Sequence, residues 1–142
     1  MLRPLTNLER RQNEFTSEAV TRGVRVRVVS RYSRDQSHPE QNRWFFIYTI
    51  TISNEGDKTV QLITRHWIIE NADGEVDEVK GDGVVGEQPI LAAGEAFEYS
   101  SGCHLSTPFG SMRGTYQMLV DDGANFDATI APFTLSEPYT VH

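Results

Sequence analysis

The residues with the clearest chemical potential form a glycine-rich stretch in the middle of the chain. Gly81, Gly83 and Gly86 have the spacing G-x-G-x-x-G. Glycines let backbone N–H groups come close to an anion, so this spacing is found in loops that bind phosphate. Arg65 and Arg113 are candidate charge partners for the anion. One hypothesis is therefore a site for a nucleotide or pyrophosphate on this glycine loop.

The sequence around the loop also supports a purely structural role. Dinucleotide-binding loops open a helix whose N-terminus meets the phosphates, but Glu87 and Pro89 follow Gly86 here and no helical periodicity appears. Lys80 precedes the loop, so the Walker pattern is absent as well. Asp82 and Glu87 would repel a phosphate at close range. On this interpretation the glycines serve tight turns, bulges or the close approach of strands.

Acidic side chains surround the same region and suggest a second chemistry. Asp73, Asp77 and Asp82 could attract a divalent cation weakly through carboxylate oxygens. The run lacks the glycine and the terminal glutamate of an EF-hand loop, so a solvated hairpin is the alternative. A bound metal could in turn assist hydrolysis of phosphoanhydrides, although the sequence identifies no base for the attacking water.

No catalytic residue is predicted from the remaining motifs. The chain contains no G-x-S-x-G, no H-E-x-x-H and no paired cysteines. Cys103 lies in a strand pattern and is interpreted as a buried apolar residue rather than a nucleophile. His66 and His104 could form a ligand pair only if folding brings their strands together. We expect a noncatalytic protein without a cofactor.

Length and charge restrict the class of protein. The 142 residues fit one domain, and the net charge of −7 argues against a nucleic-acid binder. Residues 1–43 hold nine arginines and five acidic residues, whereas the rest is strongly acidic. One cysteine allows no internal disulfide, and no apolar run is long enough to span a bilayer. We expect a soluble, cytoplasmic protein.

Alternating apolar residues predict an all-β fold. Val24, Val26 and Val28 alternate with arginines that should point outward. Residues 43–53 are dense in aromatic and β-branched side chains and should form a central strand. Residues 59–70 continue the pattern, with either both faces covered or a bulge near residues 64–66 that redirects the side chains. Asp73-Gly74 indicates a hairpin with a type I′ turn. Further strands are predicted at residues 76–79, 97–105, 116–120 and 126–135, with Pro132 at an edge or bend.

These segments amount to about seven or eight short strands separated by turns. The economical arrangement is an antiparallel β-sandwich over residues 21–142. Residues 1–20 are polar and are predicted to form an N-terminal tail or a short helix.

Several motifs together resemble the bacterial ApaG family, also called CorD. They are R-H-W-I-I at residues 65–69, G-D-G-V-V-G-E-Q-P at 81–89, Y-S-S-G at 99–102, and the segment from T-P at 107–108 to M-R-G-T-Y at 112–116. The resemblance implies a fibronectin type III or immunoglobulin-like sandwich. It also implies protein binding, as in related domains of a ubiquitin-ligase adaptor, and a link to cobalt resistance and magnesium efflux.

The leading functional hypothesis is a noncatalytic module that presents an edge strand or a loop cluster to an unknown partner protein. Nucleotide or pyrophosphate binding at residues 81–86 is the alternative, and the resemblance implies the same loop for it. Open sheet edges also invite pairing between copies, so a homodimer is a further prediction.

Overall fold

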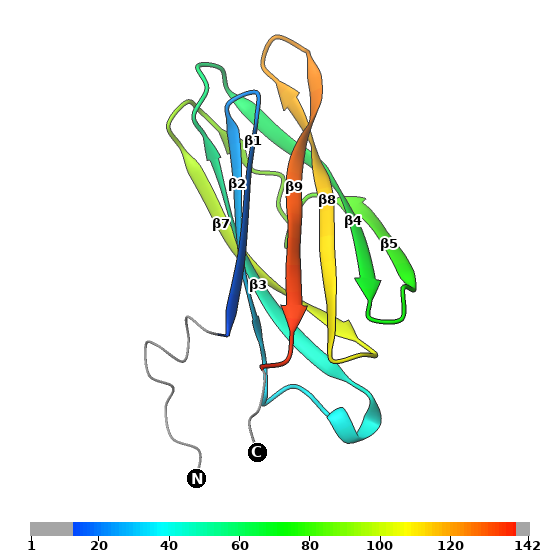
Figure 1. Ribbon diagram of the computed structural model, residues 1–142. Helices are drawn as coiled ribbons and strands as arrows, with labels where there is room; N and C mark the ends of the chain where they lie inside the picture. The colour runs from blue at the N-terminus through cyan, green and yellow to red at the C-terminus, as the bar shows by residue number, and fades with distance from the viewer. Residues whose placement is uncertain (1–12, 139–142) are drawn as a thin grey trace.

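Two antiparallel sheets pack face to face in the computed structural model, which describes residues 13–138 (Figure 1). The first sheet has the order β1-β2-β3-β7 and contains β1 (Glu14–Thr21), β2 (Val24–Tyr32), β3 (Trp44–Asn54) and β7 (Ala96–Leu105). The second sheet has the order β5-β4-β8-β9 and contains β4 (Val60–Asn71), β5 (Val76–Asp82), β8 (Phe109–Val120) and β9 (Asn125–Ser136), with the short β6 (Ile90–Leu91) pairing to β4. The predicted antiparallel sandwich is confirmed, while its assignment to the fibronectin or immunoglobulin type stays a prediction.

The core follows from the period-two pattern of the central strands. Along β3 every second residue is buried, beginning with Trp44. Val24, Val26 and Val28 of β2 are fully buried on the same face. Complete burial of such a side chain stabilises the fold by roughly 1.5–3 kcal/mol. Alternation in the sequence therefore identifies the inner face of the first sheet correctly.

The N-terminal segment differs from the expectation of a tail or short helix. Glu14–Thr21 forms β1, which pairs antiparallel with β2 along its whole length. Its half-buried positions include small or polar residues such as Ser17 and Ala19, which hide the period of two in the sequence. The Ser17 hydroxyl donates to the carbonyl of Ala131 at 2.9 Å and so joins β1 to β9. Residues 1–12 lie outside the described residues.

Two irregularities shape the second sheet. The pairing of β4 with β8 shifts between Leu62 and Thr64, so the predicted bulge is present near the expected position. The β4–β5 hairpin is also present, but the predicted type I′ turn is wrong. Gly74 has φ +83° and its amide donates to Asn71 at 3.1 Å, whereas Asp73 keeps a negative φ. This pattern is a type I turn followed by a left-handed glycine.

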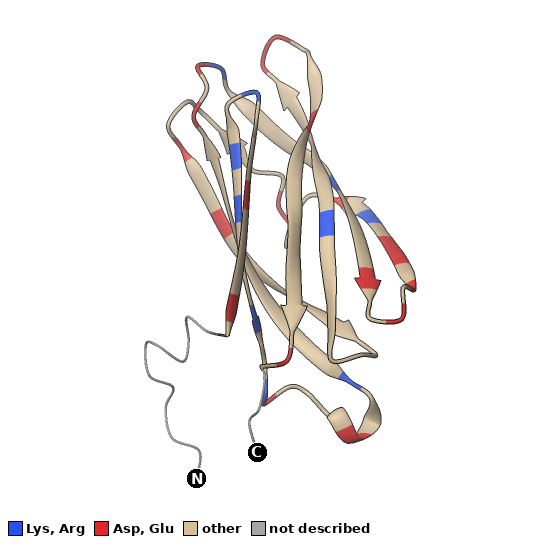
Figure 2. Cartoon of the chain, in the orientation of Figure 1, with Lys and Arg blue, Asp and Glu red and all other residues tan. Residues whose placement is uncertain are grey.

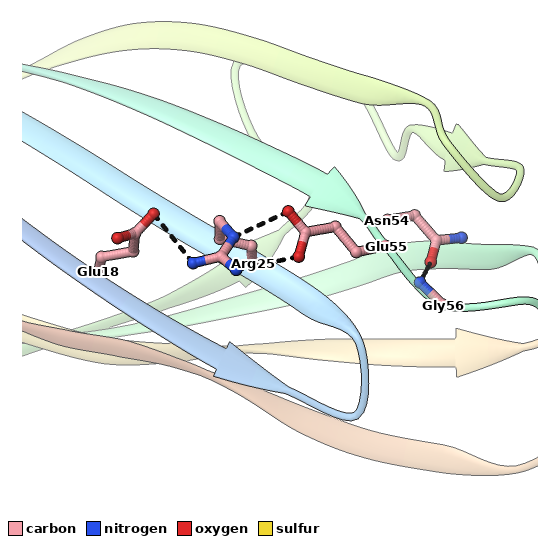
Figure 3. Close-up of polar contacts among 5 residues, drawn as sticks. All are labelled: Glu18, Arg25, Asn54, Glu55 and Gly56. Atoms are coloured by element: carbon pink, nitrogen blue, oxygen red, sulfur yellow. Dashed lines mark hydrogen bonds and ion pairs between the residues drawn. The ribbon is translucent and has the colours of Figure 1, made fainter.

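Charged side chains lie mainly on the outer surfaces. Basic positions follow β2, and acidic positions gather on the β4–β5 hairpin (Figure 2). Arg25 donates to Glu55 at 2.8 Å and lies 3.2 Å from Glu18, which links β1, β2 and the turn after β3 (Figure 3). In that turn the Asn54 side-chain oxygen accepts the amide of Gly56 at 3.1 Å. The predicted outward direction of the β2 arginines is confirmed.

The sandwich is closed on one side and open on the other. On the closed side β1 and β2 pack against β9. On the other side the outer strands are β7 of the first sheet and β5 of the second. Within residues 13–138 the one helix is the 3-10 turn Pro39–Gln41, and no helix is long and apolar enough to cross a membrane. The open side holds a cavity that residues of both sheets line.

Candidate functional site

A cavity of about 590 Å³ lies between β7 and β5 on the open side of the sandwich. Residues from β3, β4, β5, β7, β8 and the glycine loop line it. We call it the edge cleft and define it by six of these residues: Tyr48, Arg65, Trp67, Val84, Tyr99 and Cys103. Its size falls in the range of ligand-binding clefts.

Arg65 is the basic side chain that faces the edge cleft. Beyond the β4 bulge, Arg65 shares the inner face with the buried Trp67. Its Nη1 donates to the carbonyl oxygens of Asp82 and Gly83, each at 2.9 Å. The guanidinium lies against Gly81, where an added Cβ would come within 2.8 Å of Nη2. Within residues 13–138, Nε and Nη2 donate no hydrogen bond, so two donors remain for a ligand.

Tyr48 and Tyr99 line the edge cleft, and Tyr116 is buried next to Tyr99. The hydroxyl groups of Tyr99 and Tyr116 share a hydrogen bond across the sandwich, from β7 to β8. Burial raises the pKa of both phenols well above the usual range, and it also raises the pKa of Tyr48. All three are therefore neutral near pH 7. They can accept or donate hydrogen bonds, but they supply no charge of their own.

Cys103 is buried on the inner face of β7, as predicted. Burial, with a smaller contribution from the carboxylate of Asp77, raises its thiol pKa from 9.0 to about 11. The thiol is therefore protonated at neutral pH, and the thiolate is the form that attacks electrophiles.

We expect iodoacetamide to alkylate Cys103 about 100-fold more slowly in the folded protein than in the unfolded chain at pH 8, because the raised pKa lowers the thiolate fraction by about that factor. Mass spectrometry of timed samples with and without guanidinium would measure both rates. Rates that agree within threefold would contradict a buried, protonated thiol.

The glycine loop is a tight hairpin. The amides of Val84 and Glu87 donate to each other's carbonyls at 2.8 and 2.9 Å, and the amide of Gly83 donates to Ile63 at 2.9 Å. Val85 and Gly86 have φ +43° and +81°, the signature of a type I′ turn. Three loop amides are thus already bonded to carbonyls, which fits the structural reading of the glycines.

Val85 is an unusual residue for that turn. A β-branched side chain rarely adopts positive φ, and such a conformation costs of order 1–3 kcal/mol. Val85 is also 58% exposed at the mouth of the edge cleft. The loop therefore holds an exposed apolar side chain in a strained position beside the cleft.

The structure separates the two candidate arginines. Arg65 faces inward beside the glycine loop, whereas Arg113 lies on the outer face of β8 with its Nη1 4.0 Å from Glu70. His66 and His104 are also apart, because His66 lies on β4 beside Glu78 and His104 packs against Phe45 in the other sheet. Of these residues, the fold brings only Arg65 to the loop.

The three candidate metal ligands are likewise dispersed. Asp73 lies in the β4–β5 turn, and Asp77 and Asp82 are five residues apart along β5. Five residues of a strand span about 16 Å. Within residues 13–138, no three His, Cys, Asp or Glu side chains are placed to hold a metal ion together.

Comparisons with known proteins identify the family. The family model of the ApaG domain matches residues 34–120. A Protein ApaG of Pseudomonas fluorescens is 54% identical over 119 residues, covering 84% of this chain and 94% of that protein. The chain belongs to the ApaG family. The chain is also 55% identical over 122 residues to Protein ApaG of Anaeromyxobacter dehalogenans, covering 86% of this chain and 96% of that protein.

A solved structure supports the fold of this ApaG chain. The crystal structure of a Bordetella pertussis protein described as ApaA superimposes with a TM-score of 0.80 at 50% identity. The match covers 82% of this chain and 95% of the Bordetella chain. The resemblance noted from the sequence motifs is therefore confirmed at the level of family and sandwich fold.

Sequence reasoning missed the edge cleft as a unit. Alternation within residues 43–53 and 97–105 predicts that Tyr48 and Tyr99 both point inward, and the pairing of β3 with β7 brings them together from positions 51 residues apart. The available signal was the alternation of apolar residues in both strands. This alternation indicates which side chains point inward, but it does not specify which strands become neighbours.

Proposed function

We propose that this ApaG domain is a noncatalytic binding module that takes up an extended segment of a partner protein along the free edge of β7. The observation that carries the proposal is this ten-residue edge strand, which pairs with β3 on one side and borders the edge cleft on the other. Strand addition to such an edge is a recurring mode of peptide recognition.

The backbone direction of β7 supports strand addition. The amide of Asn54 donates to Glu95 at 2.9 Å, which fixes the phase of the ladder between β3 and β7. Because an antiparallel ladder alternates, Tyr99 and Cys103 direct their amides toward β3. The amides directed toward the free edge belong to Glu98, Ser100, Gly102 and His104.

Charge distribution favours β7 over β5 as the receiving edge. Most of β5 is exposed, and it carries Asp77, Glu78, Lys80 and Asp82 within seven residues. Charged side chains on an edge, above all inward-facing ones such as Asp77, discourage pairing. By contrast, Glu98 is the one acidic residue of β7, and it lies on the outer face. The β7 edge is therefore the less protected one.

The chemistry of the edge cleft supports binding rather than catalysis. Its phenols and its thiol are protonated near neutral pH, which suits them to hydrogen bonding and packing but not to nucleophilic attack. The family resemblance implies a link to cobalt and magnesium homeostasis. We propose that the protein acts in the cytoplasm and that its role in metal homeostasis depends on the partner protein that β7 binds.

Ser100→Pro is expected to deplete the partners recovered by tagged protein at least tenfold relative to Ser100→Ala. Both variants lose the hydroxyl contact with Thr49, but only proline removes the N–H on the free edge. Quantitative mass spectrometry of crosslinked native lysate would measure recovery, with melting temperature as the folding control. Equal recovery with both variants, or no specific partner for Ser100→Ala, would reject the proposal.

Nucleotide or pyrophosphate binding at residues 81–86 is the second candidate, because Arg65 leaves Nε and Nη2 free beside the loop. Gly83→Val is a poor test, since a side chain on Gly83 would clash with the carbonyl of Glu87. The better comparison is an NMR titration with pyrophosphate or ADP, with and without magnesium, of Arg65→Met and Arg113→Met. Shifts lost only in Arg65→Met would support this candidate, and unchanged shifts would reject it.

A further inference from the structure

We propose that the segment bound at β7 carries an aspartate or glutamate whose carboxylate pairs with Arg65 in the edge cleft. This inference rests on the proposed function, because it names the side chain that the added strand brings into the cleft. It assigns the partner a chemical class, an extended segment with an inward-facing acidic residue.

Strand addition itself directs side chains into the edge cleft. Neighbouring strands lie about 4.8 Å apart, so a strand beside β7 continues the first sheet across the open side toward β5. Every second side chain of that strand points inward. These side chains meet Tyr99 and Cys103 from β7, and Val79 from β5. The cleft is therefore the pocket for the inward half of the bound segment.

Arg65 is the group in the edge cleft that most needs a partner. Elsewhere in residues 13–138, Arg25 pairs with Glu18 and Glu55, but no ion pair joins Arg65 to a carboxylate. Its Nη1 is anchored to two backbone carbonyls, which fixes the guanidinium in place. A half-buried guanidinium without a counterion is unfavourable, and a charge-assisted pair with a carboxylate relieves that cost.

Geometry and charge favour a carboxylate over a phosphate. The free Nε and Nη2 form one side of the guanidinium fork, which matches the two oxygens of a carboxylate. Asp77 lies on the same face of β5 as Val79, which lines the cleft, and Asp82 lines the cleft next to Arg65. These acids repel a doubly charged phosphate more strongly than a singly charged carboxylate. An inward-facing aspartate or glutamate matches the free side of the guanidinium and is repelled less by Asp77 and Asp82 than a phosphate would be.

A second copy of the chain does not supply this group through β7. The inner face of β7 carries Phe97, Tyr99, Ser101, Cys103 and Leu105, none of which is acidic. A β7–β7 homodimer would therefore leave both Arg65 side chains without a carboxylate. A segment of a different protein with an inward-facing acidic residue would supply the carboxylate that β7 of a second copy lacks.

The test begins with a random twelve-residue peptide library displayed on phage and selected against the full chain. Wild type and Arg113→Met should both enrich peptides with Asp or Glu at one fixed position. Arg65→Met should lose that preference while retaining the wild-type circular dichroism spectrum. Arg113 is the matched control because it also lies on a strand of the second sheet but faces outward beside Glu70.

A double-mutant cycle on one selected peptide then separates direct pairing from a structural effect of Arg65. Asp→Asn in the peptide should weaken binding to wild type at least tenfold and leave binding to Arg65→Met unchanged. Equal losses in both proteins would overturn the pairing with Arg65. A further outcome would also overturn the proposal. If millimolar acetate displaces the peptide from wild type, and Ser100→Pro binds the peptide as tightly as wild type does, the cleft binds the anion independently of strand addition.

The outcomes distinguish this inference from the proposed function. Selected peptides that lack an acidic preference but bind Ser100→Ala and not Ser100→Pro would overturn the role of Arg65 and leave strand addition standing. Peptides that bind Ser100→Pro and Ser100→Ala equally, or failure to enrich any peptide, would overturn both.

Discussion

Gly114→Ala is expected to lower the free energy of unfolding by about 3 kcal/mol or more, because the added methyl group has no space. A Cβ on Gly114 would clash with the carbonyl oxygen of His66. Gly114 pairs with Trp67 of β4, so the obstacle is the backbone of the central strand pair and cannot rotate away. Urea unfolding followed by far-UV circular dichroism would measure the loss.

Gly102→Ala provides the matched control. A Cβ on Gly102 would meet the ring of Phe45, which is a half-buried side chain that can change its rotamer. We therefore expect a smaller loss, about 1 kcal/mol, from the same chemical change. Equal losses at Gly102 and Gly114 would contradict the conclusion that the backbone of β4 leaves no space for a side chain at position 114.

Trp67→Ala is expected to destabilise the fold by about 3–5 kcal/mol, the usual cost of removing a buried tryptophan. Trp67 is 3% exposed, and its ring lies 5.4 Å from Tyr48 and 5.9 Å from Phe133. Tyr48 belongs to the first sheet and Phe133 to the second, so Trp67 packs the two sheets together at the base of the edge cleft. Urea unfolding followed by circular dichroism would again give the change.

Trp44→Ala is the comparison for this substitution. Trp44 is also nearly buried, but it stands at the start of β3, and its Nε1 donates to Glu137 at 3.0 Å near the end of the described chain. Among residues 13–138, Trp67 contacts the rings of Tyr48, Tyr116 and Phe133, whereas Trp44 has fewer aromatic neighbours, so removal of Trp44 should cost about half as much. A larger loss at Trp44 than at Trp67 would show that the edge cleft is not the point where the sheets are held together.

The strands and the inner face of β3 were predictable because a half-buried strand has a period of two, and Trp44 to Ile52 display it openly. The strand at Glu14–Thr21 was not, since Ser17 and Ala19 occupy its inward positions. The turn at Gly74 was misassigned because Asp-Gly also occurs where a type I turn is followed by a left-handed glycine. Local sequence thus identifies strands more reliably than turn geometry.

The candidate site was predictable only in part. The glycines and Arg65 were identified, but the inward direction of Arg65 depends on the β4 bulge, and the edge cleft depends on β7 crossing to pair with β3. Both are consequences of long-range pairing, which local periodicity does not encode. The pairing of Arg113 with Glu70 on the outer face was hidden for the same reason.

The central claim is that β7 receives a partner segment by strand addition. Amide hydrogen exchange by NMR tests it most directly, with a peptide selected from the phage library as the probe. In the free protein, the amides of Glu98, Ser100 and Gly102 should exchange faster than those of Tyr99 and Ser101, because only the latter bond to β3. The account predicts at least tenfold slower exchange of the outward amides when the peptide is bound. Saturated binding with no change in their exchange would contradict it.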